Sequence, residues 1–514
     1  AASALHSRTG LEEAGVRLMP GMQRLLDATA GNSEFLAKLI AHLPEFFEAL
    51  CQRGPDESFM ELIGWMQADM PLIQNREEMV VMLRKARAKM ALITAVADIS
   101  ATWSVQEVTS RLSDFADLCI QCATSLLLRE AESKKIISLP DPARPHLGSG
   151  LLVLAMGKLG GHELNYSSDI DLILLFDEEV LPYHGRQSLQ HFFTQLAQNL
   201  CDMLQQRTRD GYVFRTDLRL RPDPRSTPLA VKLRSAVTYY ETLGQNWERA
   251  AMIKARPVFA DPNTEGTFEQ ARRAFIWRKH LDFAAIEDIH SIKRQINARV
   301  GEELQAAGHH VKLGRGGIRE IEFYVQIQQL IWGGRDDTLR SASTDTALSR
   351  LHESGHVSTS AFTQLREAYW FLRRVEHYIQ MQRDQQNHTV PEDHEARAEL
   401  AIFLGYAQRE DFEAALLTHC RRVHDIYAQS MQSSPPLSAG GNLVFTGVEA
   451  DPDTLRTLLR MGFSQPMHVS DTIQSWHRGG RRATRGLRAR QLLTELTPAL
   501  LSAFADTPNP DDAF

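Results

Sequence analysis

The sequence predicts an α+β protein in which a small mixed domain lies between largely helical regions. Apolar residues recur three and four positions apart from about residue 15 to 132 and again from about 266 to 431, as in amphipathic helices. Between these regions, short apolar runs alternate with a glycine-rich turn and one helical segment. Because 514 residues are too many for one core, we expect three or four domains.

Breaks rich in proline and glycine predict the domain boundaries. Residues 138–145 contain too much proline to continue a helix, and residues 433–441 have the composition of a linker. The chain opens on Ala-Ala-Ser without an initiator methionine, so we expect it to be a piece of a longer protein. The predicted units are a helical N-terminal domain over 1–137, a mixed domain over 146–262, a helical domain over 263–432, and a linker with the start of a further helical region over 433–514.

Three strands and two helices are predicted in the first part of the mixed domain. Leu151 to Met156 and Ile170 to Phe176 are apolar runs typical of buried strands, and the glycine-rich turn between them should open a short helix. From Leu189 to Leu204, apolar residues follow the spacing of an amphipathic helix. Tyr212 to Arg221 alternates as a third strand. The side chains expected to face the core from this strand are Phe214, Leu218 and Leu220.

Composition excludes several classes of function. The chain is 43% hydrophobic and 24% charged, which is ordinary for a globular protein. Its net charge of −7 argues against general nucleic-acid binding, since proteins that follow a phosphate backbone are usually basic. No apolar stretch approaches the length of a membrane span, and the start lacks a signal-peptide pattern. With five cysteines and no disulfide framework, we predict a cytoplasmic protein without membrane or nucleic-acid partners.

An Asp-x-Asp motif opens the second predicted strand. Residues i and i+2 of a strand point to one face, so Asp169 and Asp171 share a side, with Cα atoms roughly 6.6 Å apart. Such carboxylates can together hold hard divalent cations, which prefer oxygen ligands. A two-metal site normally needs a third carboxylate, and Asp217 is the only acid on the polar face of the third strand. The alternative is a pair of surface residues on an edge strand.

Residues near these aspartates could bind a phosphate. The glycines of the turn allow close approach and expose backbone N–H groups, and nearby serines add hydroxyl donors. Arginines alternate with Asp217, so a phosphate could meet guanidinium groups and a metal together. Each feature also has a simpler interpretation. The arginines could form a solvated charged face, the glycines a simple tight turn, and the loop with Lys312 and Arg315 an ordinary helix start. The candidates are Gly157, Lys158, Gly160, Gly161, Ser167, Ser168, Arg215, Arg219, Arg221, Lys254 and Arg256 on a strand from Met252 to Val258, and Lys312 and Arg315 in a glycine-rich loop before a helix.

Other conspicuous residues are given structural interpretations. Cys119 and Cys122 form a lone CxxC within a helical run and are predicted to be buried small side chains. His309 and His310 lack metal-ligand spacing and are predicted to lie on the surface.

Five blocks of the sequence together resemble a known family: Met156–Gly161 with Glu163–Leu172, Phe214–Pro222, Trp247–Arg256 and Lys312–Phe323. They are similar to the nucleotidyltransferase domains of glutamine synthetase adenylyltransferase/adenylyl-removing enzymes, within the DNA polymerase β-like nucleotidyltransferase superfamily. The resemblance spans most of residues 148–380. It implies a polymerase β-like catalytic domain flanked by largely helical domains. The tail, with its cluster Arg481–Arg485, resembles the start of the helical regulatory region that follows the family's first catalytic half.

The resemblance also implies a reaction. Enzymes of this family fuse two similar halves, of which one adenylylates a tyrosine of glutamine synthetase from ATP and the other removes the AMP by phosphorolysis, releasing ADP. One catalytic domain after a helical region and before a linker resembles the adenylyl-removing half. Asp169, Asp171 and Asp217 would then hold two Mg²⁺ or Mn²⁺ ions. Adenylylated glutamine synthetase would be the partner, and the PII nitrogen-signal protein the effector.

Three other functions stay open at this point. The same metal site would serve forward adenylyl transfer from ATP. The fold could also be an inert docking module, although the complete acidic set argues against that. A tRNA-end polymerase would use the same core, but the acidic net charge counts against it.

Overall fold

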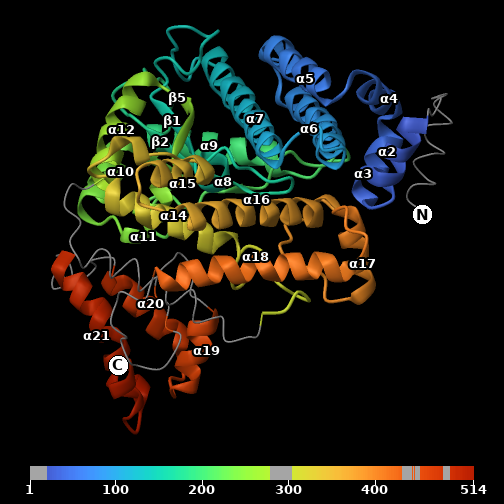
Figure 1. Cartoon of the computed structure of the whole chain (residues 1–514). Helices are drawn as coiled ribbons and strands as arrows, with labels where there is room; N and C mark the ends of the chain where they lie inside the picture. The colour runs from blue at the N-terminus through green and yellow to red at the C-terminus, as the bar shows by residue number, and fades with distance from the viewer. Residues whose placement is uncertain (1–19, 278–303, 431–442, 444, 446–451, 478–486) are drawn as a thin grey trace.

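Figure 1 shows the computed structural model, which describes residues 20–277, 304–430, 443, 445, 452–477 and 487–514. A small sheet lies between the N-terminal helices and the helices that follow it in the chain. The predicted α+β class with flanking helices is therefore confirmed. Within these segments, no helix combines the length and the apolar character needed to cross a membrane.

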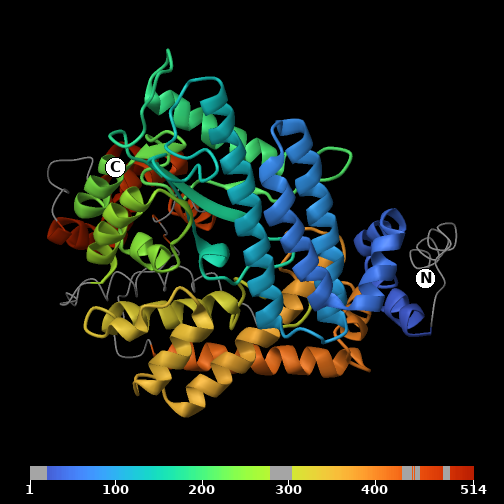
Figure 2. The same cartoon turned by 90° about the horizontal axis from the view of Figure 1, so that it is seen from above.

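The N-terminal region is helical from residue 20 onwards, as predicted. Its longest helix starts with a capping box, in which Ser104 Oγ accepts from the backbone N–H of Glu107 and the Glu107 carboxylate accepts from that of Ser104. That helix packs on the sheet (Figure 2), and Cys119 and Cys122 are buried in it, as predicted. The helices are α2 (Pro20–Ala30), α3 (Glu34–His42), α4 (Pro44–Arg53), α5 (Pro55–Asp69), the short 3-10 helix η1 (Met70–Leu72), α6 (Arg76–Ile99) and α7 (Val105–Ser133).

Five strands form the sheet: β1 (Leu151–Ala155), β2 (Ile170–Phe176), β3 (Thr216–Asp217), β4 (Ala230–Lys232) and β5 (Arg256–Ala260). β1 lies between β2 and β5 and is antiparallel to both. The first residues of β2 pair with β3 and its last residues pair with β4, both in parallel. β1 and β2 are covered on both faces, which is why their sequences are continuous apolar runs.

The helices around the sheet include both of those predicted from the sequence. A short helix, α8 (Gly157–Gly160), follows the glycine turn, and α9 (Leu189–Gln205) is the predicted amphipathic helix. The others are α10 (Leu233–Thr242), α11 (Asn246–Ile253) and α12 (Pro262–Ile276).

Two predicted strands are wrong in extent. Of the run Tyr212–Arg221 only Thr216 and Asp217 form a strand, because the Asp217 carboxylate accepts the backbone N–H of Arg219 at 2.8 Å and bends the chain into a turn. Phe214 and Leu218 are buried as predicted, whereas Leu220 is only half-buried. The strand predicted from Met252 to Val258 starts only at Arg256, because α11 continues to Ile253 and places Lys254 in the turn between them.

Helices from both sides of the sheet share its core. One continuous apolar cluster contains residues of α2–α7, one face of the sheet, and helices that follow the sheet. The opposite sheet face, with Leu152, Leu154, Ile173 and Leu175, packs on α10–α12 in a second cluster. The following helices are α14 (Ile318–Trp332), the 3-10 helix η2 (Asp337–Leu339), α15 (Thr344–Glu353), α16 (Thr359–Met381), α17 (His394–Phe403) and α18 (Arg409–Gln429).

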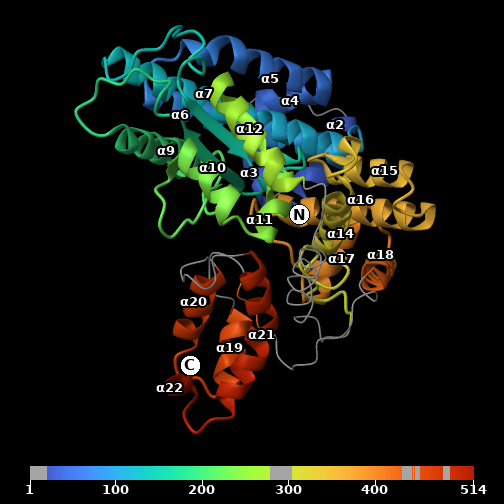
Figure 3. The same ribbon diagram turned by 90° about the vertical axis from the view of Figure 1, so that its left-hand side faces the viewer.

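The C-terminal helices have a small apolar cluster of their own, which includes Leu458, Phe463 and Ile473. They lie together at one side of the structure (Figure 3). These helices are α19 (Pro452–Arg460), α20 (Pro466–His477), α21 (Leu487–Ala505) and α22 (Pro510–Ala513). The predicted linker over 433–441 and the arginine cluster 481–485 lie outside the described residues.

Gly160 marks the tightest crossing of backbones in the sheet region. A Cβ atom there would lie 1.8 Å from the Lys254 carbonyl oxygen and 2.7 Å from that of Ala155. We expect Gly160→Ala to lower the free energy of unfolding by about 2 kcal/mol or more, because backbone must move to admit the methyl group. The midpoint of thermal unfolding measures this. Gly64→Ala is the matched control, since its Cβ meets nothing within 4 Å and alanine favours a helix interior by roughly 1 kcal/mol.

Candidate functional site

Two adjacent parallel strands bring the three predicted aspartates together. Asp169 directly precedes β2, and Asp171 is the second residue of that strand. Asp171 is paired in register with Asp217 of β3, so the two residues lie side by side on strands about 4.8 Å apart. Burial raises the pKa of the Asp171 carboxyl to about 6, with further contributions from the negative charges of Asp217 and Asp169. The three carboxylates thus share one electrostatic environment.

Arginines neutralise the two outer carboxylates. Arg215 Nε donates to Asp169 Oδ1 at 2.5 Å, and Arg219 donates from Nη2 and Nε to Asp217 Oδ2 at 2.7 and 2.9 Å. Within the described residues, no group of three or more His, Cys, Asp or Glu side chains is arranged to hold a metal ion. Metal binding by Asp169, Asp171 and Asp217 therefore stays a prediction, and an ion there would compete with Arg215 and Arg219.

Asp171 differs from its two neighbours, because no hydrogen bond or ion pair from the described residues reaches its carboxylate. Its Oδ2 lies against the backbone of Gly157, where φ is +55° and a Cβ atom would come within 2.7 Å. The charge of Lys312 acts on Asp171 and lowers its pKa, partly offsetting the burial. Lys312 is half-buried and, like Arg315, forms no hydrogen bond or ion pair through its side chain among the described residues. These two cations are available to an anion.

Four other predicted phosphate-binding cations have structural partners instead. Lys158 Nζ donates to Glu376 at 2.8 Å, and burial lowers the Lys158 pKa to about 7. The remaining contacts are Lys254 Nζ with Glu163 and with Glu322, both at 2.8 Å, Arg256 with Asp117 at 2.6 and 2.9 Å, and Arg221 with the backbone carbonyls of Leu218 and Pro224, both at 2.8 Å. Their proposed role in phosphate binding is untested, and any phosphate would have to displace these partners.

The predicted glycines and serines lie in the segment between β1 and β2, which consists of α8 and the loop that follows it. Ser167 and Ser168 are both buried. The backbone N–H of Ser167 donates to Gln380 Oε1 at 2.9 Å, and its carbonyl accepts from Arg215 at 2.6 Å. A Cβ atom on Gly161 would meet the Ala342 carbonyl oxygen at 3.0 Å. This loop is therefore held from both sides by fixed hydrogen bonds.

A buried polar network from α16 holds that loop, and sequence reasoning missed it. The fully buried Arg373 guanidinium donates to Asn165 Oδ1 at 3.0 Å, to Tyr369 Oη at 2.8 Å and to the Glu163 carbonyl. Glu376 accepts from Lys158. Burial by itself would raise the pKa of Glu376, but Lys158 and the other nearby cations outweigh burial, so this pKa lies well below the usual range. α16 thus positions the residues that surround the aspartates.

A sequence signal for this network does exist. Arg373, Glu376 and Gln380 are spaced i, i+3 and i+7, so they share one face of a helix whose neighbouring positions are apolar. Polar residues on the buried face of a helix require polar partners. The pattern does not reveal which distant segment supplies those partners, because the loop lies more than 200 residues earlier.

The prediction that His309 and His310 are surface groups is wrong. His309 is buried against Cys420, with 3.4 Å between Nε2 and Sγ, and His310 is half-buried and stacks on His388 at 5.4 Å between ring centroids. Both precede the loop that carries Lys312. Burial, helped by His310, lowers the pKa of His309 to about 4.

This buried imidazole predicts a pH dependence of stability. The folded-state pKa of His309 lies below its ordinary value of 6.5, so the unfolded chain binds more protons between pH 6.5 and 4. Stability should fall as the pH drops through that window, by about 2–3 kcal/mol from this group. We expect His309→Gln to flatten this part of the curve of unfolding free energy against pH. The exposed His394→Gln should leave it unchanged.

Comparisons with known proteins identify the family. A model of the glutamate-ammonia ligase adenylyltransferase family matches residues 22–271, which contain all three aspartates. A second model, described as GlnD PII-uridylyltransferase, matches residues 290–431, which contain α14–α18. The first match ends within α12, and the second begins before α14.

Relatives match over nearly the whole chain. A protein of Mesorhizobium japonicum is 46% identical over 495 residues, covering 96% of this chain and 50% of the relative. One from Rhizobium meliloti is 49% identical over 440 residues (85% and 44%), and one from Brucella melitensis 43% over 516 residues (99% and 52%). Each is named a bifunctional glutamine synthetase adenylyltransferase/adenylyl-removing enzyme. The chain spans about half the length of these relatives, and it belongs to the glutamate-ammonia ligase adenylyltransferase family.

Proposed function

We propose that this chain removes AMP from an adenylylated tyrosine of glutamine synthetase by phosphorolysis, giving ADP. The observation that carries the proposal is the placement of Asp169 and Asp171 at the start of β2 beside Asp217 of β3, with Lys312 nearby. The names of the relatives support glutamine synthetase as the substrate, since they describe both addition and removal of the adenylyl group.

Carboxylate oxygens are the donor type that suits a pair of hard divalent cations such as Mg²⁺ or Mn²⁺, and Asp169 and Asp217 would have to leave Arg215 and Arg219 to bind them. Asp171 is a carboxylate without a hydrogen-bond or ion-pair partner among the described residues, and burial together with two neighbouring carboxylates raises its pKa, so a bound cation would stabilise its charged form. Asp169, Asp171 and Asp217 would hold the ions through oxygen, the ligand type that these cations prefer. When bound, the ions would orient the attacking phosphate and neutralise the charge that develops on the leaving tyrosyl oxygen.

The protein's own residues would do the remaining work by positioning. Lys312 and Arg315 are cations available to an incoming phosphate, and Arg215 and Arg219 could turn to it once an ion occupies the carboxylates. Phosphate is already anionic, so it needs little help from a general base. Two effects would supply most of the reduction in the activation barrier: alignment of the attacking phosphate with the phosphorus of the AMP group, and stabilisation of the charge that develops on the leaving tyrosyl oxygen.

An assay with purified adenylylated glutamine synthetase tests the proposal. Release of ADP that requires both phosphate and Mg²⁺ or Mn²⁺ is expected. Consumption of ATP with release of pyrophosphate would instead assign forward adenylylation to this chain. Activity that responds to the PII signal protein would support our further proposal that PII is an effector of this half.

A further inference from the structure

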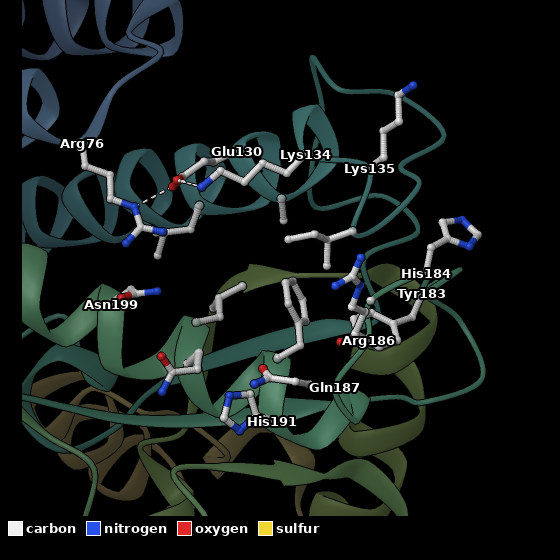
Figure 4. A pocket seen from close by; sticks show the side chains of 17 residues that line it. Arg76, Glu130, Lys134, Lys135, Tyr183, His184, Arg186, Gln187, His191 and Asn199 are labelled. Atoms are coloured by element: carbon white, nitrogen blue, oxygen red, sulfur yellow. Dashed lines mark hydrogen bonds and ion pairs between the residues drawn. The ribbon is translucent and has the colours of Figure 1, made fainter.

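A cavity of about 620 Å³ opens between α7 and α9, beside the loop that follows β2 (Figure 4). Its volume lies within the range of roughly 300–1,000 Å³ that is usual for small-molecule sites. Residues from the start of α6, the end of α7, the loop 183–187 and α9 as far as Asn199 line it. None of the residues predicted to act in catalysis is among them.

The cavity is separate from the aspartates. Asp171 is at the start of β2, whereas the lining loop follows the end of that strand, and five strand steps span about 17 Å. α9 gives a second measure. Its last residue, Gln205, accepts from Thr216 Oγ1 next to Asp217, while the lining residues His191 and Asn199 lie 14 and 6 residues earlier, or about 21 and 9 Å along the helix.

Positive charge dominates the lining, although the chain as a whole carries −7. Arg76, Lys134, Lys135 and Arg186 stand against a single carboxylate, Glu130. Glu130 accepts from both Arg76, at 2.5 Å, and Lys134, so it is already shared between two cations. An excess of positive charge therefore remains in the cavity.

Arg186 has no hydrogen-bond or ion-pair partner in the part of the chain that the structure describes. Figure 4 shows its guanidinium between the two helices, whereas the end of Lys135 points away from them. Directly after Gln187, Ser188 caps α9, a helix of 17 residues whose positive end adds to the potential here. Asn199 from the middle of α9 likewise makes no side-chain hydrogen bond within the described residues.

The walls between these polar groups are apolar. Leu127 and Ile136 contribute from the side of α7, and Leu196 and Phe192 from α9. Phe192 packs on Tyr183 of the loop, with 5.7 Å between ring centroids. A ligand that satisfies such walls needs a flat apolar body as well as a charged group.

We propose that this cavity binds a small organic anion, a phosphate or carboxylate group on a flat apolar body, with the anionic group at Arg186 and the body against Phe192 and Leu196. The site is separate from the proposed reaction site, so the bound anion would act on the enzyme from a distance and would not be consumed by it.

Calorimetric titration with phenyl phosphate tests the proposal, in buffer without divalent cations. We expect saturable binding that weakens at least tenfold in Arg186→Glu and in Asn199→Trp, which fills the cavity. The matched control Arg24→Glu, an exposed arginine of α2, should bind like the parent chain. Benzoate in place of phenyl phosphate distinguishes a carboxylate from a phosphate preference, and neutral benzyl alcohol should bind far more weakly than either.

Equal affinity in Arg186→Glu and Arg24→Glu would overturn the proposal, as would absence of binding by both anions. Binding of an acidic peptide without binding of either small anion would instead indicate a protein-docking surface and would also overturn it. A Lys312→Ala variant separates this inference from the proposed reaction. It should lose AMP removal while keeping its affinity for phenyl phosphate at the cavity.

Discussion

Asp171→Asn should abolish AMP removal while leaving the protein at least as stable as before. The substitution keeps the shape of the side chain but removes a charged oxygen ligand, and we expect the rate to fall about a thousandfold or more, which corresponds to several kcal/mol in the barrier. In the absence of metal, the Asp171 carboxylate is destabilised by burial and by two neighbouring carboxylates. Removing its charge should therefore stabilise the fold at pH 7, by as much as about 2 kcal/mol.

The opposite signs of these two effects make the experiment decisive. Phosphate-dependent ADP release measures the activity, and thermal unfolding with and without MgCl₂ measures the stability. Mg²⁺ should raise the unfolding midpoint of the parent chain but not that of Asp171→Asn. Asp177→Asn, at the other end of β2, is the control and should change neither activity nor the response to Mg²⁺. Full activity in Asp171→Asn would remove the metal site from the proposed mechanism.

Arg373→Ala is expected to be the most destabilising single change at the site. Arg373 is fully buried and its guanidinium donates to Asn165, Tyr369 and the Glu163 carbonyl. Truncation leaves these acceptors buried without a donor and removes a positive charge near Glu376. Loss of one partner from a buried charged network typically costs about 3–5 kcal/mol. The midpoint of denaturant unfolding should shift accordingly.

The adjacent Arg374→Ala is a matched control, because Arg374 is only half-buried and contacts the ring and hydroxyl of Tyr378. We expect it to cost no more than about 1 kcal/mol. Hydrogen exchange gives a second readout. Arg373→Ala should accelerate exchange of the amides between residues 163 and 168, which the network holds, before global unfolding. Unchanged exchange in that loop would show that α16 does not position it.

Local patterns were sufficient to predict most elements. Continuous apolar runs located β1 and β2, and helical spacing located α9 and the flanking helices. The third strand was overestimated, because alternation of Arg and Leu from Phe214 to Arg221 resembles a strand even where the Asp217 carboxylate draws the chain into a turn. His309 was misplaced for a related reason, since a polar residue in a loop is usually exposed and only packing against Cys420 buries it.

The sequence by itself predicted that Asp169 and Asp171 share one face, because residues i and i+2 of a strand do so; in the structure Asp171 lies in β2 and Asp169 directly precedes it. It also supplied the blocks whose resemblance pointed to the family that the comparisons identified. Only the tertiary structure decided which charged residues meet. Lys158, Lys254 and Arg256 seemed equivalent to Lys312 along the chain, but long-range partners on α7, α14 and α16 neutralise the first three and leave Lys312 beside Asp171. Ion pairing depends on distance in space, and sequence separation carries no information about that distance.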